Sequence, residues 1–206
     1  MTSDHGFRRL VGFGDAVVAI AITLLILPLV DSASSIGTTG LDEFYHHNSA
    51  KLFAFVLSFV VIGAFWWGQH QLFERVQAYN GVLMGGMFVW LFSIVFLPFP
   101  TELIGSVTDG IAAAHALYIG TMVVTALGAL VQAGAVVRWP ELQVDAASDP
   151  VRLDPALILA GLMTLALVLT LAVPSVGLWP LLGLVLSRPL ERLADLRRRR
   201  KARPAA

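Results

Sequence analysis

Six apolar runs separated by short polar segments constrain this chain of 206 residues more than any other feature. A helix needs roughly 20 apolar residues to cross about 30 Å of hydrocarbon, and the first five runs reach that length with their flanks. The sixth run is shorter and is interrupted by Pro180. The sequence therefore predicts an all-α integral membrane protein with six transmembrane helices, at about residues 13–30, 51–67, 81–99, 112–137, 156–173 and 176–190.

The composition supports a membrane protein and excludes several kinds of site. Hydrophobic residues make up 57% of the chain and charged residues 14%, whereas about a quarter of a soluble domain is charged. Residues 31–50 are polar and acidic and are interpreted as an extramembrane loop. Segment 42–47 holds two acidic residues followed by two histidines, which could bind a divalent metal, but a hydrated acidic loop is the preferred interpretation. The third run is expected to stop at Pro98 and Pro100. The chain has no cysteine, which excludes disulfides and thiolate metal sites.

The distribution of charge favours a topology with both termini in the cytoplasm. An even number of spans places the two ends on one side, and the positive-inside rule places most basic residues there. Among the basic residues, only Lys51 then lies outside. The first helix is expected to be retained and not cleaved as a signal peptide. The basic tail, 197–206, is interpreted as a cytoplasmic topology determinant at the lipid surface of the cell membrane, with no role in binding nucleic acid. The other inside basic residues of this scheme are Arg8, Arg9, Arg75, Arg138 and Arg152.

The first apolar run carries a single carboxylate, Asp15, shortly after two arginines. An ionised side chain costs about 2.5–3.5 kcal/mol at the centre of a membrane helix, so such groups are usually paired or functional. Leu24, nine residues after Asp15, lies on the opposite side of the helix, and four side chains share its face at spacings of three, four and seven residues: Ile20, Thr23, Leu24 and Leu27. This stripe faces either lipid or a neighbouring helix, or a symmetry axis at which several copies form a hydrophobic pore constriction.

The segment from Arg9 to Asp15, RLVGFGD, resembles the R-x-x-x-F-S-D signature of the transmembrane protein 175 family of potassium channels. The apolar residues that follow resemble the first helix of that family. Gly14 replaces the serine of the signature, and the sequence offers no reason for the exchange. Fragments in the second and third runs also match the family pattern, so the resemblance covers about residues 9–100: Ser58-Phe59, Ile62-Gly63, Phe65-Trp66, His70, Asn80 and Leu97-Pro98-Phe99.

The resemblance implies a potassium-selective leak channel that assembles as a homotetramer in a lipid bilayer. The first helix of each subunit would line the pore, and no carbonyl selectivity filter would be present. Ile20, Leu24 and Leu27 match apolar constrictions of the family, and Thr23 matches a polar position that contributes to selectivity. The permeant potassium ion would be the one bound species, without a cofactor or a metal site.

A polar network is expected around the signature. It would join Arg9, Phe13 and Asp15 of the first helix to the second and third helices, through Trp66, His70 and Asn80. His70 alone fits equally well as a solvated histidine beside an aromatic belt. The alternative function is a secondary transporter or proton-coupled permease in which Asp15 titrates, although midplane carboxylates and broken helix pairs are missing. An enzyme is not expected, because no nucleophile or metalloprotease motif occurs.

Overall fold

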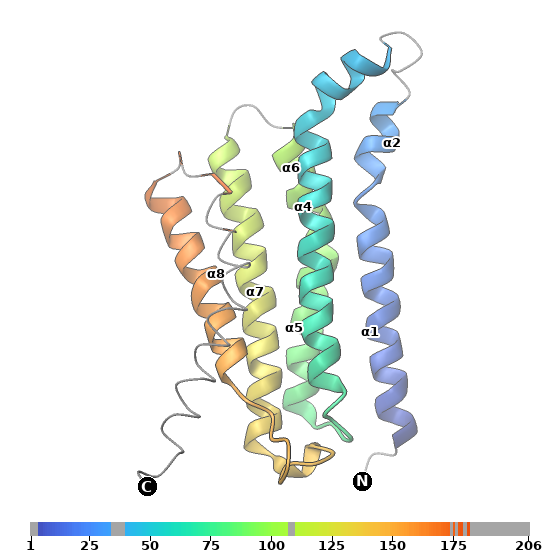
Figure 1. Cartoon of the computed structure of the whole chain (residues 1–206), viewed down its shortest axis with the longest axis vertical. Coiled ribbons are helices and arrows are strands. Elements are labelled where there is room, and N and C mark those ends of the chain that lie inside the picture. The colour runs from blue at the N-terminus through green and yellow to red at the C-terminus, as the bar shows by residue number, and fades with distance from the viewer. Residues whose placement is uncertain are drawn as a thin grey trace, which may run out of the picture.

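The computed structural model describes residues 4–33, 40–106, 110–173, 175, 177, 178 and 181, and it forms a bundle of long helices without strands in these residues (Figure 1). Within these described residues, five stretches are long and apolar enough to cross a membrane, so the chain is a multi-pass membrane protein. The predicted sixth span, 176–190, lies almost wholly outside the described residues, and the tail 197–206 lies wholly outside them. The helices are α1 (Asp4–Leu24), α2 (Leu27–Ala33), α4 (Leu41–Phe73), α5 (Gly81–Phe96), α6 (Pro98–Ser106), α7 (Ile111–Arg138), the 3-10 turn η1 (Pro140–Leu142) and α8 (Asp154–Ala172).

Helix α4 begins ten residues before the predicted second span. The interpretation of 31–50 as a loop is therefore wrong over 41–50, and the histidine-containing segment 42–47 is helical. This segment is polar but holds no glycine or proline, so nothing in it interrupts a helix. Phe44 and Asn48, four residues apart, are both buried, and the Asn48 amide donates to the Phe44 carbonyl at 3.1 Å.

The prolines at the end of the third run interrupt the helix without ending it. The prediction that the span stops at Pro98 and Pro100 is wrong, because α6 continues after a break at Leu97. Both prolines lie in the first turn of α6, where backbone N–H groups have no partner within the helix in any case. The Thr101 N–H then donates to the Leu97 carbonyl at 3.1 Å and carries the chain onward.

The first span is also broken, at residues 25 and 26 between α1 and α2. Pro28 has no N–H to donate to the carbonyl four residues before it, that of Leu24. The N–H groups of Leu29 and Val30 both donate to the carbonyl of Ile26, at 3.0 Å each.

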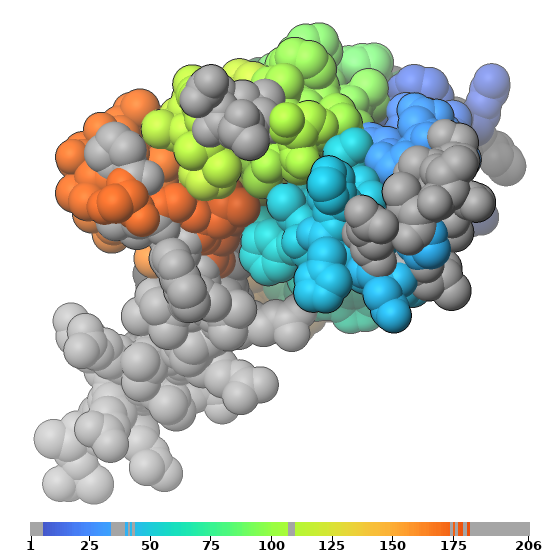
Figure 2. Space-filling model, turned by 90° about the horizontal axis from the view of Figure 1, so that it is seen from above, coloured from blue at the N-terminus to red at the C-terminus, as the bar shows by residue number. Residues whose placement is uncertain are grey.

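Glycines let α5 and α7 approach closely at the centre of the bundle. A Cβ on Gly128 of α7 would lie 3.0 Å from the backbone nitrogen of Trp90, and a Cβ on Gly86 of α5 would lie 2.9 Å from Cγ of Gln132. Small residues at a crossing are the usual means by which membrane helices pack. In the most apolar stretch of α7, 56% is buried inside the bundle, against 22% in the first span (Gly6–Ala33) and 22% in α8. Seen from above, α1 with α2 and α8 lie at opposite edges of the bundle (Figure 2).

A buried hydroxyl cluster ties α4, α6 and α7 together. The Ser58 hydroxyl lies 2.8 Å from the Thr101 hydroxyl and 3.1 Å from the Tyr118 hydroxyl. Thr101 also donates to the Leu97 carbonyl at 2.8 Å. All three side chains are at most 5% exposed, so the cluster satisfies its own polar atoms within the bundle.

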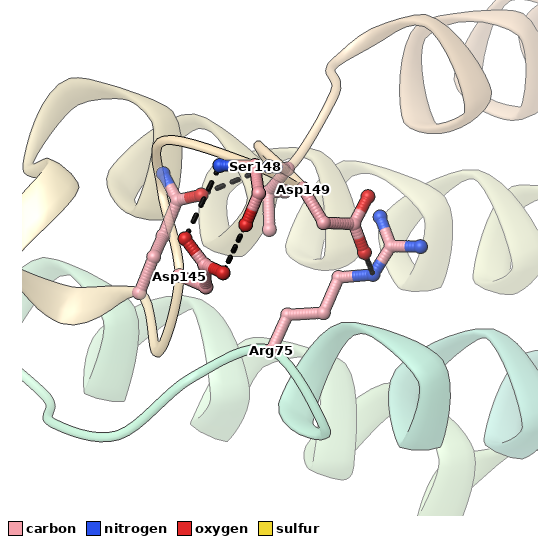
Figure 3. Close-up of polar contacts among 6 residues, drawn as sticks. Arg75, Asp145, Ser148 and Asp149 are labelled. Carbon is pink, nitrogen blue, oxygen red and sulfur yellow. Dashed lines mark hydrogen bonds and ion pairs between the residues drawn. The ribbon is translucent and has the colours of Figure 1, made fainter.

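One end of the bundle is closed by contacts between the α4–α5 turn and the loop after α7. The Val144 N–H donates to the Arg75 carbonyl at 3.0 Å, and Arg75 Nε lies 3.3 Å from a carboxylate oxygen of Asp149 (Figure 3). In the same loop, Ser148 donates to the Asp145 carboxylate from both its hydroxyl and its backbone N–H. These hydrogen bonds lower the pKa of Asp145 below its ordinary value.

The start of α1, the α4–α5 turn and the α7–α8 loop all lie at this same end (Figure 1). Arg8, Arg9, Arg75, Arg138 and Arg152 lie in or directly beside these segments. Among the described residues, the helix order therefore brings these five arginines to one end of the bundle.

Candidate functional site

The predicted stripe is exposed, with Ile20, Thr23 and Leu24 on α1 and Leu27 at the start of α2. The exposed fractions of Ile20, Leu24 and Leu27 are 61%, 40% and 49%, and Thr23 is also exposed. The opposite side of α1 faces the bundle and is buried, as at Val18, Ala21 and Leu25 (all at most 6% exposed). The stripe is therefore free to contact something outside this subunit.

Thr23 is the polar member of the stripe. Its hydroxyl donates to the Ile20 carbonyl at 2.8 Å. This bond uses the hydroxyl hydrogen and leaves the lone pairs of Oγ1 as acceptors.

Asp15 is held by the second long helix. Nε1 of Trp66 in α4 donates to Oδ1 of Asp15 at 2.9 Å. The Trp66 ring stacks on His70 with centroids 5.4 Å apart, and His70 Nε2 lies 3.3 Å from a carboxylate oxygen of Glu74. The carboxylate of the signature thus fixes α1 against α4 through an indole donor.

The other predicted members of the network are not joined to Asp15. Arg9 is exposed, and Phe13 is 52% exposed on the side of α1 that carries the stripe. Asn80 instead caps α5, where its side-chain oxygen accepts from the backbone N–H groups two and three residues later. Among the described residues no hydrogen bond or ion pair links Arg9 or Asn80 to Asp15.

The glycine at the serine position of the signature lies against a methionine of α5. Gly14 is buried, and a Cβ there would lie 2.7 Å from the terminal methyl of Met87. The Met87 side chain is itself 2% exposed. The long methionine therefore occupies the volume in which a serine side chain would lie, and α1 contacts α5 at this point.

A groove runs between the start of α1 and the end of α4. Its volume is about 370 Å³, and Asp15 and His70 line its inner end. It is mixed in character, with apolar walls and four titratable or charged side chains. The lining residues are Phe7, Arg8, Val11, Gly12, Asp15, His70, Phe73 and Glu74.

Sequence reasoning missed a buried polar group deeper in the bundle. Nε2 of Gln69 in α4 donates to Oε1 of Gln132 in α7 at 2.5 Å, and Gln132 in turn donates to the Gly128 carbonyl at 3.3 Å. Gln69 is 8% exposed and Gln132 is fully buried. Two glutamines within otherwise apolar helices were the available signal, because such amides usually hydrogen-bond across helices.

The sequence of this chain is similar to those of known proteins. The family model described as endosomal/lysosomal potassium channel TMEM175 matches residues 9–98. A potassium channel of Streptomyces collinus is 34% identical over 122 residues, which cover 58% of this chain and 59% of the relative. A potassium channel of Chryseobacterium sp. (strain P1-3) is 33% identical over 99 residues, 48% of each chain. The chain thus matches these curated relatives over about half of their length.

A solved structure extends the likeness to the whole fold. The crystal structure of a lysosomal potassium-selective channel TMEM175 homolog from Chamaesiphon minutus superposes with a TM-score of 0.72. The match covers 93% of this chain and 99% of the other, at 22% sequence identity. At this identity the likeness establishes a shared helical fold.

Proposed function

We propose that the chain is a member of the TMEM175 family, whose model matches residues 9–98, and that it is a potassium-selective leak channel whose pore is lined by the exposed stripe. The observation that carries the proposal is the combination of that stripe with the break at residues 25 and 26. The break lies inside the apolar run that spans the membrane, and Pro28 leaves the Leu24 carbonyl without its usual donor.

A broken helix is poorly suited to contact with lipid. Unpaired backbone groups at membrane depth are tolerated where they are buried in protein or line a water-filled cavity. Helix α8 offers an internal comparison, because it is as peripheral as α1 but runs unbroken from Asp154 to Ala172. The exposed side of α8 suits lipid, whereas the exposed side of α1 suits protein contact or water.

The buried side of α1 sets the direction in which the stripe points. The Trp66–Asp15 hydrogen bond fixes α1 against α4, and the contact of Gly14 with Met87 fixes it against α5. With these two contacts made, Ile20 and Leu24 can turn only outward from the subunit. Four copies around an axis would bring their stripes together as the wall of one pore.

Selectivity would arise from a narrow apolar neck. A cation that passes a ring of leucines keeps part of its hydration shell or waits for the ring to widen. Potassium holds its water less tightly than sodium, so a narrow neck favours potassium. The lone pairs of Thr23 would give a partly dehydrated ion its one side-chain oxygen ligand within the stripe.

The proposed assembly is a homotetramer in the cell membrane with both termini in the cytoplasm. The end of the bundle that holds Arg75, Arg138 and Arg152 would face the cytoplasm under the positive-inside rule. Chemical crosslinking in membranes should then show a ladder that ends at four subunits, and a ladder that ends at two would contradict the tetramer.

The decisive experiment measures ion flux in proteoliposomes. Wild type should conduct potassium more readily than sodium, and Leu27→Ala should change the conductance or the potassium-to-sodium ratio because it widens the neck. Leu165→Ala is the matched control, since Leu165 is similarly exposed (53%) but lies on α8. If Leu27→Ala and Leu165→Ala behave alike in both measures, the neck does not lie at the stripe.

The same assay separates a channel from a proton-coupled permease that uses Asp15. A channel gives a reversal potential that follows the potassium gradient at every pH. A permease gives one that shifts with the proton gradient, and Asp15→Asn would abolish that shift.

A further inference from the structure

A small cavity lies behind the Asp15–Trp66 hydrogen bond, between α1, α4 and α5. It offers the centre of a water molecule about 10 Å³, which is about the least space that holds one water. Asp15, Gln69 and Trp90 all line it. Asp15 and His70 also line the wide groove, so the cavity lies next to that groove.

Two buried polar atoms that lack a protein partner belong to residues that line this cavity. Nε1 of Trp90 is a donor in a side chain that is 2% exposed, and Oε1 of Gln69 is an acceptor in a side chain that is 8% exposed. The two atoms are chemically complementary but make no hydrogen bond with each other. Buried polar groups left without partners are rare because each one costs its full desolvation penalty.

We propose that this cavity is a binding site for one structural water molecule that bridges Trp90 Nε1 to Gln69 Oε1. The water accepts the hydrogen bond of the indole N–H through its oxygen. It donates one hydrogen to the Gln69 carbonyl oxygen and directs the other toward the Asp15 carboxylate. Internal waters typically make about three hydrogen bonds, which matches this set.

The donor and acceptor pattern selects water over an ion. An indole N–H repels a cation, and a glutamine carbonyl oxygen beside a carboxylate repels an anion. Water satisfies both signs at once.

The bridge would extend the signature contact into the centre of the bundle. From Asp15 the chain of hydrogen bonds would run through the water to Gln69, and then through Gln132 to the Gly128 carbonyl. The Asp15 carboxylate would thereby be linked to α5 and α7, whereas its direct hydrogen bond reaches only Trp66 of α4.

The direct test is an experimental structure of the full chain at a resolution that shows internal waters. We expect a density peak about 2.7–3.2 Å from both Trp90 Nε1 and Gln69 Oε1. A direct Trp90–Gln69 hydrogen bond, or an empty cavity in a map that shows other buried waters, would overturn the proposal. This test needs no variant.

A double-mutant cycle tests the bridge in solution. Trp90→Phe and Gln69→Met should each lower Tm, by roughly 2–8 °C, and the double variant should lose clearly less than the sum because both act on one water. The Gln69–Gln132 hydrogen bond is lost both in Gln69→Met and in the double variant, so its contribution cancels from the coupling between Trp90 and Gln69. Trp67→Phe paired with Gln69→Met is the control and should be additive, since Trp67 is 49% exposed. Additive losses for Trp90 and Gln69 would refute a shared water.

Discussion

The close contact of α5 with α7 makes a quantitative prediction at Gly128. An alanine there would place its Cβ 3.0 Å from N, 3.1 Å from Cα and 3.1 Å from Cβ of Trp90, all inside the 3.4 Å at which ordinary contact begins. Because two of these are backbone atoms, a side-chain rotation cannot relieve the overlap and the helices must move apart. Overpacking of this kind costs about 1–3 kcal/mol.

Helix propensity acts in the opposite direction and sets the net effect. Alanine is better than glycine in a helix interior by about 1 kcal/mol, so the net loss for Gly128→Ala relative to wild type should be about 0–2 kcal/mol. For a chain of this size that corresponds to a fall in Tm of up to roughly 8 °C.

The measurement is thermal unfolding in detergent or nanodiscs, with two matched controls on the same helix. Gly120→Ala and Gly134→Ala gain the same propensity, and a Cβ at either position meets nothing within 4 Å. Both should match or exceed the wild-type Tm. If Gly128→Ala is as stable as these controls, then the close crossing of α5 and α7 is not what holds the bundle together.

Three further predictions concern hydrogen bonds. Tyr118→Phe should cost about 0.5–1.5 kcal/mol, seen as a lower Tm, because it removes one hydroxyl from a buried cluster whose other members stay paired. Asp15→Asn keeps an oxygen for Trp66 and should keep more of the wild-type Tm and assembly by size-exclusion chromatography than Asp15→Ala; normal assembly of both with altered flux would point to a gating role instead. Ser148→Ala should raise the pKa of Asp145 toward its ordinary value in an NMR titration; the Ser148 hydrogen bonds stabilise the fold above that ordinary pKa, and this contribution is lost as pH falls through the lowered folded-state pKa.

Apolar run length predicted the helices well and their ends poorly. Burial in lipid requires long apolar segments, so α7 and α8 lie within two residues of their predicted limits. Outside the hydrocarbon that requirement ends, and composition no longer separates helix from loop, as residues 41–50 show. Pro98 and Pro100 misled for a related reason, since proline ends one helix but also starts the next.

The part of the candidate site around Asp15 was predictable, because a buried or membrane-embedded carboxylate needs a hydrogen-bond donor. A nearby tryptophan was a reasonable candidate for that donor. The fit of Gly14 against Met87 could not be predicted, because it depends on which turn of α5 meets α1. The same holds for Trp90 and Gln69, whose atoms become neighbours only after three helices pack.

The break in the first span divides it mechanically. The α1 part, which carries Leu24, is fixed to its own subunit through Asp15, whereas the α2 part is fixed near its far end, where Lys51 donates to the Ser32 hydroxyl at 2.9 Å. Leu27 is the first residue of α2, so two layers of the stripe belong to two separately anchored helices joined at the break. In the proposed channel, a displacement of the outer end of α4 would move the layer of Leu27 and leave the layer of Leu24 in place, so the two layers would open independently.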